Sequence, residues 1–221
     1  MTQTVEKNEE LTGYILIHRA IERNLRLLEE HSQAQVNPSI SKVKKVSDWW
    51  NLLWEIIETH HLVEDNTAFP AYFQRDPRIK DQMDSLTADH HVLDDLVVQI
   101  KSCLEVAQQP GDHREGVYRQ YLDTLGKFNS LMFAHLTREE GFVLPTEAAL
   151  FSHEESVALE QSIIKNTPMK VLALEAPFMF YRVDPAIEND FLKKVPLFLK
   201  VIYKLSWKGK FAKRLAGYMA A

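Results

Sequence analysis

Apolar residues recur at alternating steps of three and four along four stretches of the chain. This spacing places them on one face of an α-helix, and regular β-strand alternation is nearly absent. Only seven glycines and nine prolines interrupt the 221 residues. The pattern predicts an all-α protein, an up-down-up-down four-helix bundle. The stripes comprise Leu11, Tyr14, Ile21, Leu25 and Leu28; Val46, Trp50, Leu53 and Ile57; Ile79, Met83, Leu86, Leu93, Val97, Ile100 and Leu104; and Tyr118, Tyr121, Leu125, Phe128 and Met132.

Each stripe contains or runs into a histidine where its spacing calls for a hydrophobic residue. These residues are His18, His60, His90 and His135. A single histidine on an apolar helix face is more often a hydrogen-bonded core residue than a metal ligand. Four of them in equivalent positions favour metal binding, because buried polar groups need a common partner.

Two of these histidines are followed one turn later by a glutamate. "HHLVEDNTAFP" at 60–70 and "AHLTREEGFVLP" at 134–145 share the pattern H-x-x-x-E-[ED]-x-x-x-[FL]-P, which pairs His60 with Glu64 and His135 with Glu139. Residues i and i+4 lie on the same helix face, so imidazole and carboxylate can converge on one cation. The repeat predicts two helical hairpins, each contributing half of a two-metal site at one layer near one end of the bundle.

Residues around the repeated motif have expected structural roles. Pro70 and Pro145 are expected to end or turn their helices, so that His135 lies near a helix end. The preceding Phe69 and Leu144 are expected to shield the site from water.

Two acidic residues and a second histidine complete the motif. Asp65 and Glu140 are expected to accept hydrogen bonds from ligand imidazoles. His61 flanks Glu64 on a helical wheel, as His60 does, and is either a further ligand or a residue that packs beside the site.

Composition and charge limit the function classes. A single cysteine excludes an internal disulfide, and neither a secretory segment nor a membrane-spanning apolar run is present, so a cytoplasmic protein is expected. Eight basic and no acidic residues lie between Phe191 and Ala221, which leaves a net charge of −13 on the rest. An acidic body disfavours nucleic acid as a partner.

The basic segment predicts an amphipathic helix that begins at Pro196. Its apolar face is expected to be Leu197, Val201 and Leu205, or Phe198, Ile202 and Leu205, with Lys200, Lys204 and Lys208 on another face. We expect this helix to dock on the acidic bundle. The alternative, contact with an anionic membrane surface or a protein partner, is opposed by the charge of the body.

Together the motifs resemble the hemerythrin-like "HHE" cation-binding domain. The resemblance rests on His18, His60-x-x-x-Glu64, Asp89-His90-x-x-Leu93 and His135-x-x-x-Glu139, and it covers residues 8–150. Residues 151–221 resemble the extra C-terminal helical segment of some bacterial members. The resemblance implies a hemerythrin-like bundle that holds two non-haem irons. Their expected ligands are His18, His60, His61, Glu64, His90, His135 and Glu139, with the two glutamates and an oxo group as bridges.

The chain departs from oxygen-carrying hemerythrins at one position. Those proteins have a second histidine one turn along the third helix, where this chain has Asp94. Imidazole and carboxylate ligands without thiolate suit iron or manganese, and the resemblance favours iron. The missing imidazole favours sensing or redox turnover over oxygen transport.

Three functions follow from this ligand set. The first is binding or sensing a small oxidant, which is dioxygen, peroxide or nitric oxide. The second is a catalase-like enzyme that decomposes peroxide, and the third is a module that folds or recruits a partner when iron binds. The sequence indicates neither the physiological ligand nor a protein partner.

Overall fold

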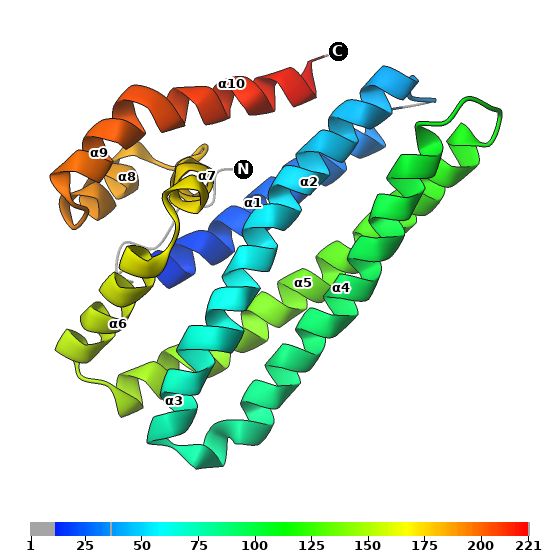
Figure 1. Ribbon diagram of the computed structural model, residues 1–221. Helices are drawn as coiled ribbons and strands as arrows, with labels where there is room; N and C mark the ends of the chain where they lie inside the picture. The colour runs from blue at the N-terminus through cyan, green and yellow to red at the C-terminus, as the bar shows by residue number, and fades with distance from the viewer. Residues whose placement is uncertain (1–11, 36, 221) are drawn as a thin grey trace.

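The computed structural model describes residues 12–35 and 37–220. Residues 8–11, including Leu11 of the first stripe, lie outside this range. Four long helices form a bundle: α1 (Gly13–Gln33), α2 (Ile40–Val63), α4 (Lys80–Ala107) and α5 (Arg114–Leu150). Helices α1 and α4 each pack against both α2 and α5, and successive long helices run in opposite directions (Figure 1). The described residues contain no strand, which confirms the predicted all-α, up-down-up-down fold.

The predicted stripes form the core of the bundle. Most of their large side chains are buried, although Tyr14 and Ile79 are half-buried. Trp50, Tyr121 and Phe128 lose almost all contact with solvent. Trp49, beside the second stripe, is buried as well. Burying a Leu-sized or larger side chain contributes about 1.5–3 kcal/mol, so the stripes supply much of the driving force for bundle formation.

Side-chain caps set the starts of several helices. The hydroxyl of Thr12 accepts a hydrogen bond from Ile15 N–H at the start of α1, and Ser39 caps α2 in the same way. Ser152 and Glu155 form a capping box at the start of α6 (His153–Asn166), as the sequence predicts.

The two motif prolines do not stop their helices, which corrects the prediction. Helix α2 continues through a π-helical turn, η1 (Glu64–Ala68), into α3 (Phe69–Arg75), and α5 runs through Pro145 to Leu150. Proline removes one backbone N–H. The π-turn accommodates Pro70 because Phe69 N–H bonds to Glu64 C=O, and beyond Pro145 regular bonding resumes. His135 therefore lies within α5 and not at its end.

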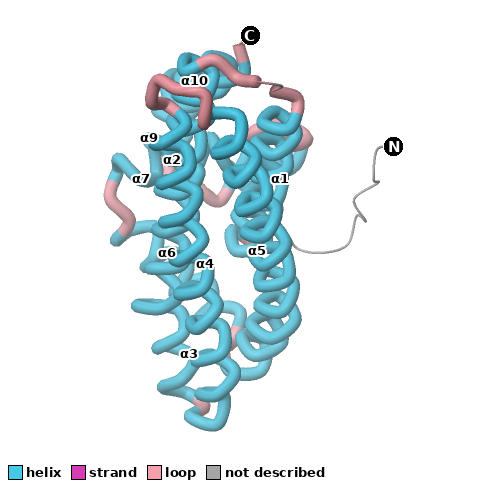
Figure 2. Tube along the Cα trace, turned by 90° about the vertical axis from the view of Figure 1, so that its right-hand side faces the viewer, coloured by secondary structure: helices cyan, strands magenta, loops and turns pink. Residues whose placement is uncertain are grey.

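The remaining elements are short. A 3₁₀ turn, η2 (Pro77–Ile79), joins α3 to α4, and α6 is followed by α7 (Met169–Phe180) and α8 (Pro185–Lys193). The chain ends in α9 (Leu197–Ile202), a π-turn η3 (Tyr203–Trp207) and α10 (Lys208–Met219), which are helical without a break and are called the tail helix below. Helix α10 lies at the end of the molecule opposite α3 (Figure 2). No described helix is long and apolar enough to cross a membrane.

The tail helix docks on the bundle, as predicted, but not through the predicted face. Tyr203, Phe211 and Leu215 are buried, and α10 packs against α2 and α7. Leu197, Phe198, Val201 and Leu205 are exposed instead, and only Ile202 of the expected set is half-buried. Aromatic contacts decide the orientation, because Phe211 packs edge-on against Phe178 and Tyr203 against Phe180.

Candidate metal centre

All seven predicted ligands are buried and lie in two neighbouring groups near the α3 end of the bundle. Within each group the candidate ligand atoms lie within 4.8 Å of one another. The first group comprises His18 of α1, His60 of α2, Glu64 of η1 and Glu139 of α5; the second comprises His61 of α2, His90 of α4 and His135 of α5.

The first group is arranged around Glu64, the residue at which α2 changes to π-helical geometry. Its Oε1 lies 3.1 Å from Nε2 of His60 and 3.8 Å from Nε2 of His18. Nε2 of His18 also lies 3.6 Å from Oε2 of Glu139. π-Turns are rare in proteins as a whole, but those that occur are often found at functional sites. Here the turn begins at Glu64, three residues after His61.

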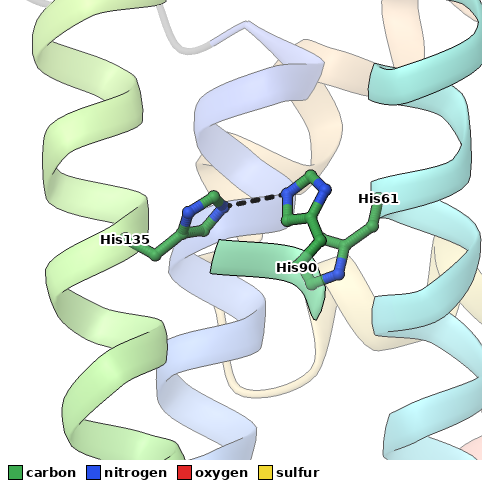
Figure 3. Close-up of side chains that lie close together, drawn as sticks. All are labelled: His61, His90 and His135. Atoms are coloured by element: carbon green, nitrogen blue, oxygen red, sulfur yellow. Dashed lines mark hydrogen bonds between the residues drawn. The ribbon is translucent and has the colours of Figure 1, made fainter. Parts of the chain in front are cut away.

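The second group consists of three imidazoles from three helices (Figure 3). Nε2 of His90 lies 3.2 Å from Nε2 of His135. The ring of His61 stacks on that of His90, with centroids 3.9 Å apart. The structure thus brings His61 into this group. Asp94 is exposed and takes no part in it.

The two glutamates connect the groups. Oε1 of Glu64 lies beside His60, whereas its Oε2 is 3.9 Å from Nε2 of His90. Oε2 of Glu139 is 3.3 Å from His135 and 3.6 Å from His18. Each carboxylate therefore reaches histidines of both groups, which is the position that a bridging ligand requires.

Carboxylates outside the centre orient three of the imidazoles. Nδ1 of each ring donates to one of them: His18 to Glu140 at 3.2 Å, His90 to Asp65 at 2.9 Å, and His135 to Asp89 at 3.2 Å. This leaves the lone pair of Nε2 directed at the centre, as in carboxylate–histidine–metal arrangements. The predicted hydrogen bonds of Asp65 and Glu140 to histidines are confirmed.

Asp89 is a residue of this outer set whose role was not predicted. It belongs to α4 and meets His135 and Arg138 of α5, so its contacts cross between helices. Asp89 directly precedes His90 in the sequence, and this is the feature from which its role could have been predicted. Arg19 contacts Glu140 in a similar way, with Nη2 2.9 Å from Oε2.

The centre contains a group of buried polar atoms without hydrogen-bond partners among the described residues. They are Nε2 of His18, His60 and His61, and both carboxylate oxygens of Glu64 and of Glu139. Leaving one such atom unsatisfied typically costs about 1–3 kcal/mol, so several in one place need an explanation. Cations bound within the two groups would give these atoms partners. The imidazole and carboxylate donors fit non-haem iron, which accepts both.

Burial controls the protonation of the centre. It lowers the pKa of His60 and His61, and neighbouring imidazoles add to the effect, so both rings are neutral as metal ligation requires. Burial raises the pKa of Glu64, and Glu139 raises it further. Burial also opposes ionisation of Glu139, but its contact with the imidazole of His135 outweighs this and lowers its pKa.

Apolar and aromatic residues cover the centre. Phe69 lies over His90 with ring centroids 6.5 Å apart, which agrees with its predicted shielding role. On α5 the predicted Leu144 is only half-buried, whereas the preceding Val143 is buried in one apolar cluster with Phe69. The ring of Tyr14 is 4.2 Å from that of His18, and its buried hydroxyl has no hydrogen-bond partner among the described residues.

Tyr14 keeps its proton. Burial raises the pKa of its hydroxyl, and the nearby charges of Glu139 and Glu64 raise it further. The hydroxyl is therefore a potential proton donor on the His18 side of the centre.

Comparison with known proteins identifies the family. Residues 15–146 match the hemerythrin HHE cation binding domain. Two zinc finger BRUTUS-like proteins of Arabidopsis thaliana are similar to the chain. One is 25% identical over 187 residues, which are 83% of this chain and 15% of that protein; the other is 28% identical over 124 residues, or 56% and 10%.

The chain thus spans less than a fifth of the length of these relatives. No solved structure matches it significantly. The family match covers more than half of the chain and includes all seven clustered residues. The chain therefore belongs to the hemerythrin HHE cation-binding family.

Proposed function

We propose that this protein holds two non-haem iron ions and binds or senses a small oxidant, namely dioxygen, peroxide or nitric oxide. The observation that carries the proposal is the position of Glu64 and Glu139, whose carboxylates lie between two groups of buried histidines. A pair of bound irons supplies reversible changes of oxidation state, which is the chemistry that such ligands require.

The two groups suggest which residues hold each ion. His18 and His60 would hold one, and His61, His90 and His135 the other, with both glutamates shared. The first group contains one imidazole fewer than the second. We propose that the oxidant binds on this side, next to Tyr14, where fewer protein ligands occupy the metal.

Tyr14 favours a second candidate function, catalase-like decomposition of peroxide. A dry pocket without a proton donor suits reversible binding, whereas breaking an O–O bond requires protons. The hydroxyl of Tyr14 is buried, protonated and adjacent to His18. An iron-responsive interaction module remains the third candidate, and increased protease resistance on adding iron would support it.

The helix boundaries support a division of the chain into a domain and an extension. We propose that residues 8–150 form the metal-binding domain and residues 151–221 an extension, because α5 ends at Leu150 and α6 has its own capping box. We propose the cytoplasm as its location, since one half-buried cysteine suits a reducing compartment.

Anaerobic reconstitution tests the metal assignment. Purified protein is loaded with Fe(II), its metal content is measured by mass spectrometry, and its optical spectrum is recorded before and after air. We expect two irons per chain and, after air, near-ultraviolet absorption of an oxo-bridged diferric centre. Protein that takes up no Fe(II), or only one ion, would contradict the proposal. Oxygen evolution on adding peroxide would favour the enzyme over the sensor.

A further inference from the structure

The outward face of the tail helix has an apolar surface in its first half. Leu197, Phe198, Val201 and Leu205 are 73%, 58%, 46% and 83% exposed. Their spacing of one, three and four residues places them together on one side of the helix. They form a contiguous stripe, called the apolar stripe below. Grouped exposed apolar residues, unlike single ones, indicate an interaction surface.

The apolar stripe does not serve the docking of the tail helix. Tyr203, Phe211 and Leu215 on the opposite side of the helix make that contact. Tyr203 donates a hydrogen bond to Glu188 at 3.1 Å, and Lys208 contacts the same carboxylate at 2.7 Å, which fixes the helix against α8. The stripe is therefore held facing outward by a docked helix.

Basic residues lie beside the apolar stripe and further along the same helix. Lys200 and Lys204 lie one turn apart beside it, and residues 191–221 contain no acidic side chain. Further along the same helix, a cleft between α10 and α2 is lined by Lys45, Lys210, Lys213 and Arg214, with Asp48 as its acidic residue. An exposed apolar stripe with basic flanks is the pattern of a helix that lies in a membrane interface.

We propose that the tail helix binds the surface of an anionic lipid bilayer. The apolar stripe enters the boundary between headgroups and acyl chains, while the lysines and Arg214 contact anionic headgroups. A second copy of this chain is a poor occupant, since two such faces would bring their lysines together. The proposal is independent of the metal centre. The centre includes His60 and His61 at the C-terminal end of α2, whereas α10 lies beside Lys45 near the start of that helix.

The acidic body does not prevent this contact. Charges farther than a Debye length, about 8 Å at physiological salt, are largely screened. Helices α4 and α5 lie on the other side of the molecule from the tail helix (Figure 1), and neither packs extensively against α10. The membrane would therefore meet the basic helix and not the acidic bundle.

Vesicle flotation with the full chain tests the proposal. Neutral phosphatidylcholine vesicles are compared with vesicles that also contain phosphatidylglycerol, at low and high salt. We expect binding to the anionic vesicles only, weakened by salt. Leu197→Ser with Leu205→Ser, and separately Lys200→Glu with Lys204→Glu, should each weaken binding at least about tenfold. Leu197, Lys204 and Leu205 are exposed and Lys200 is half-buried, so thermal unfolding of both variants should remain near that of the parent.

A matched control changes apolar residues elsewhere. Val92 and Val98 of α4 are 51% and 68% exposed, and Val92→Ser with Val98→Ser should bind anionic vesicles as the parent does. The proposal fails if the parent does not bind anionic vesicles, if neutral vesicles bind equally well, or if the control loses as much binding. Self-association that is lost in Leu197→Ser with Leu205→Ser, without vesicle binding, would identify a second copy as the occupant instead.

Discussion

The imidazole rings of His61 and His90 are stacked, with their planes only 9° from parallel (Figure 3). The two residues belong to α2 and α4, so the contact depends on how these helices pack. It places a third imidazole beside His90 and His135, although the residue one turn after His90 is the exposed Asp94. We therefore expect the histidine that is absent from the third helix to be supplied by His61.

Loss of either carboxylate that we propose as a bridge should be the most damaging change to the centre. Glu64→Ala and Glu139→Ala each remove contacts to both histidine groups, whereas His61→Ala affects one group. We expect the two glutamate variants to retain less iron than His61→Ala, by metal analysis after identical reconstitution. His31→Ala, which changes a histidine at the far end of α1, should keep the parent content. Equal occupancy in Glu64→Ala, Glu139→Ala and His61→Ala would contradict the bridging assignment.

The outer carboxylates should influence metal affinity without binding metal. Asp89→Asn weakens the acceptor for Nδ1–H of His135 and should lower iron affinity about 10–100-fold, measured by competition with a chelator. Asp94→Asn on the same helix is the matched control, because Asp94 is exposed and outside both groups. Similar affinities for Asp89→Asn and Asp94→Asn would mean that Asp89 does not orient its histidine.

Removal of the Tyr14 hydroxyl distinguishes oxidant binding from turnover. Tyr14→Phe keeps the ring beside His18 and should leave the iron content unchanged. If the protein decomposes peroxide, the rate of oxygen evolution should fall about 100-fold, the scale of a lost general acid. Parent protein that binds oxidant without evolving oxygen would show that it is a carrier or sensor. Unchanged turnover in Tyr14→Phe would eliminate the hydroxyl as the proton donor.

The pH dependence of stability should reveal the half-buried Glu175 on α7. Burial raises its pKa from about 4.5 to about 7, so between these values the folded chain binds more protons than the unfolded chain. Stability contributed by this group is therefore lost as pH rises through that window. Glu175→Gln should be more stable than the parent by at most about 3 kcal/mol at pH 8, and by less than about 1 kcal/mol at pH 5.

Urea unfolding at the two pH values measures this difference. Comparison of variant and parent at each pH cancels the pH dependence of the metal centre. Glu154→Gln, at an exposed position of α6, should match the parent at both values. The same difference at pH 5 and pH 8 for Glu175→Gln would show that the side chain does not titrate in this window.

Two leucines of the tail helix should differ in their effect on stability. Leu215 is fully buried and Leu205 is 83% exposed. Leu215→Ala should lower the free energy of unfolding by about 2–5 kcal/mol through loss of burial and the remaining cavity. Leu205→Ala should change it by less than about 0.5 kcal/mol. A comparable loss in both variants would mean that the tail helix docks in a different orientation.

Local helix geometry was predictable from the sequence. The spacing of apolar residues predicted the four bundle helices, and the four-residue step predicted that His60 meets Glu64 and that His135 meets Glu139. These relationships depend on the rotation per residue within one helix, which is the same in every α-helix. The hydrogen bonds of Asp65 and Glu140 were predictable because both residues adjoin the repeated motif.

Contacts between helices could not be predicted from the sequence and are known only from the tertiary structure. The stacking of His61 on His90 and the hydrogen bond of His135 to Asp89 depend on the rotation and depth of one helix against another. The face of the tail helix that docks was also mispredicted, because its sequence offers two apolar faces. Aromatic packing against α7 selects one of them and leaves the other exposed. Side-chain packing across the core sets these quantities, and helical periodicity does not encode them.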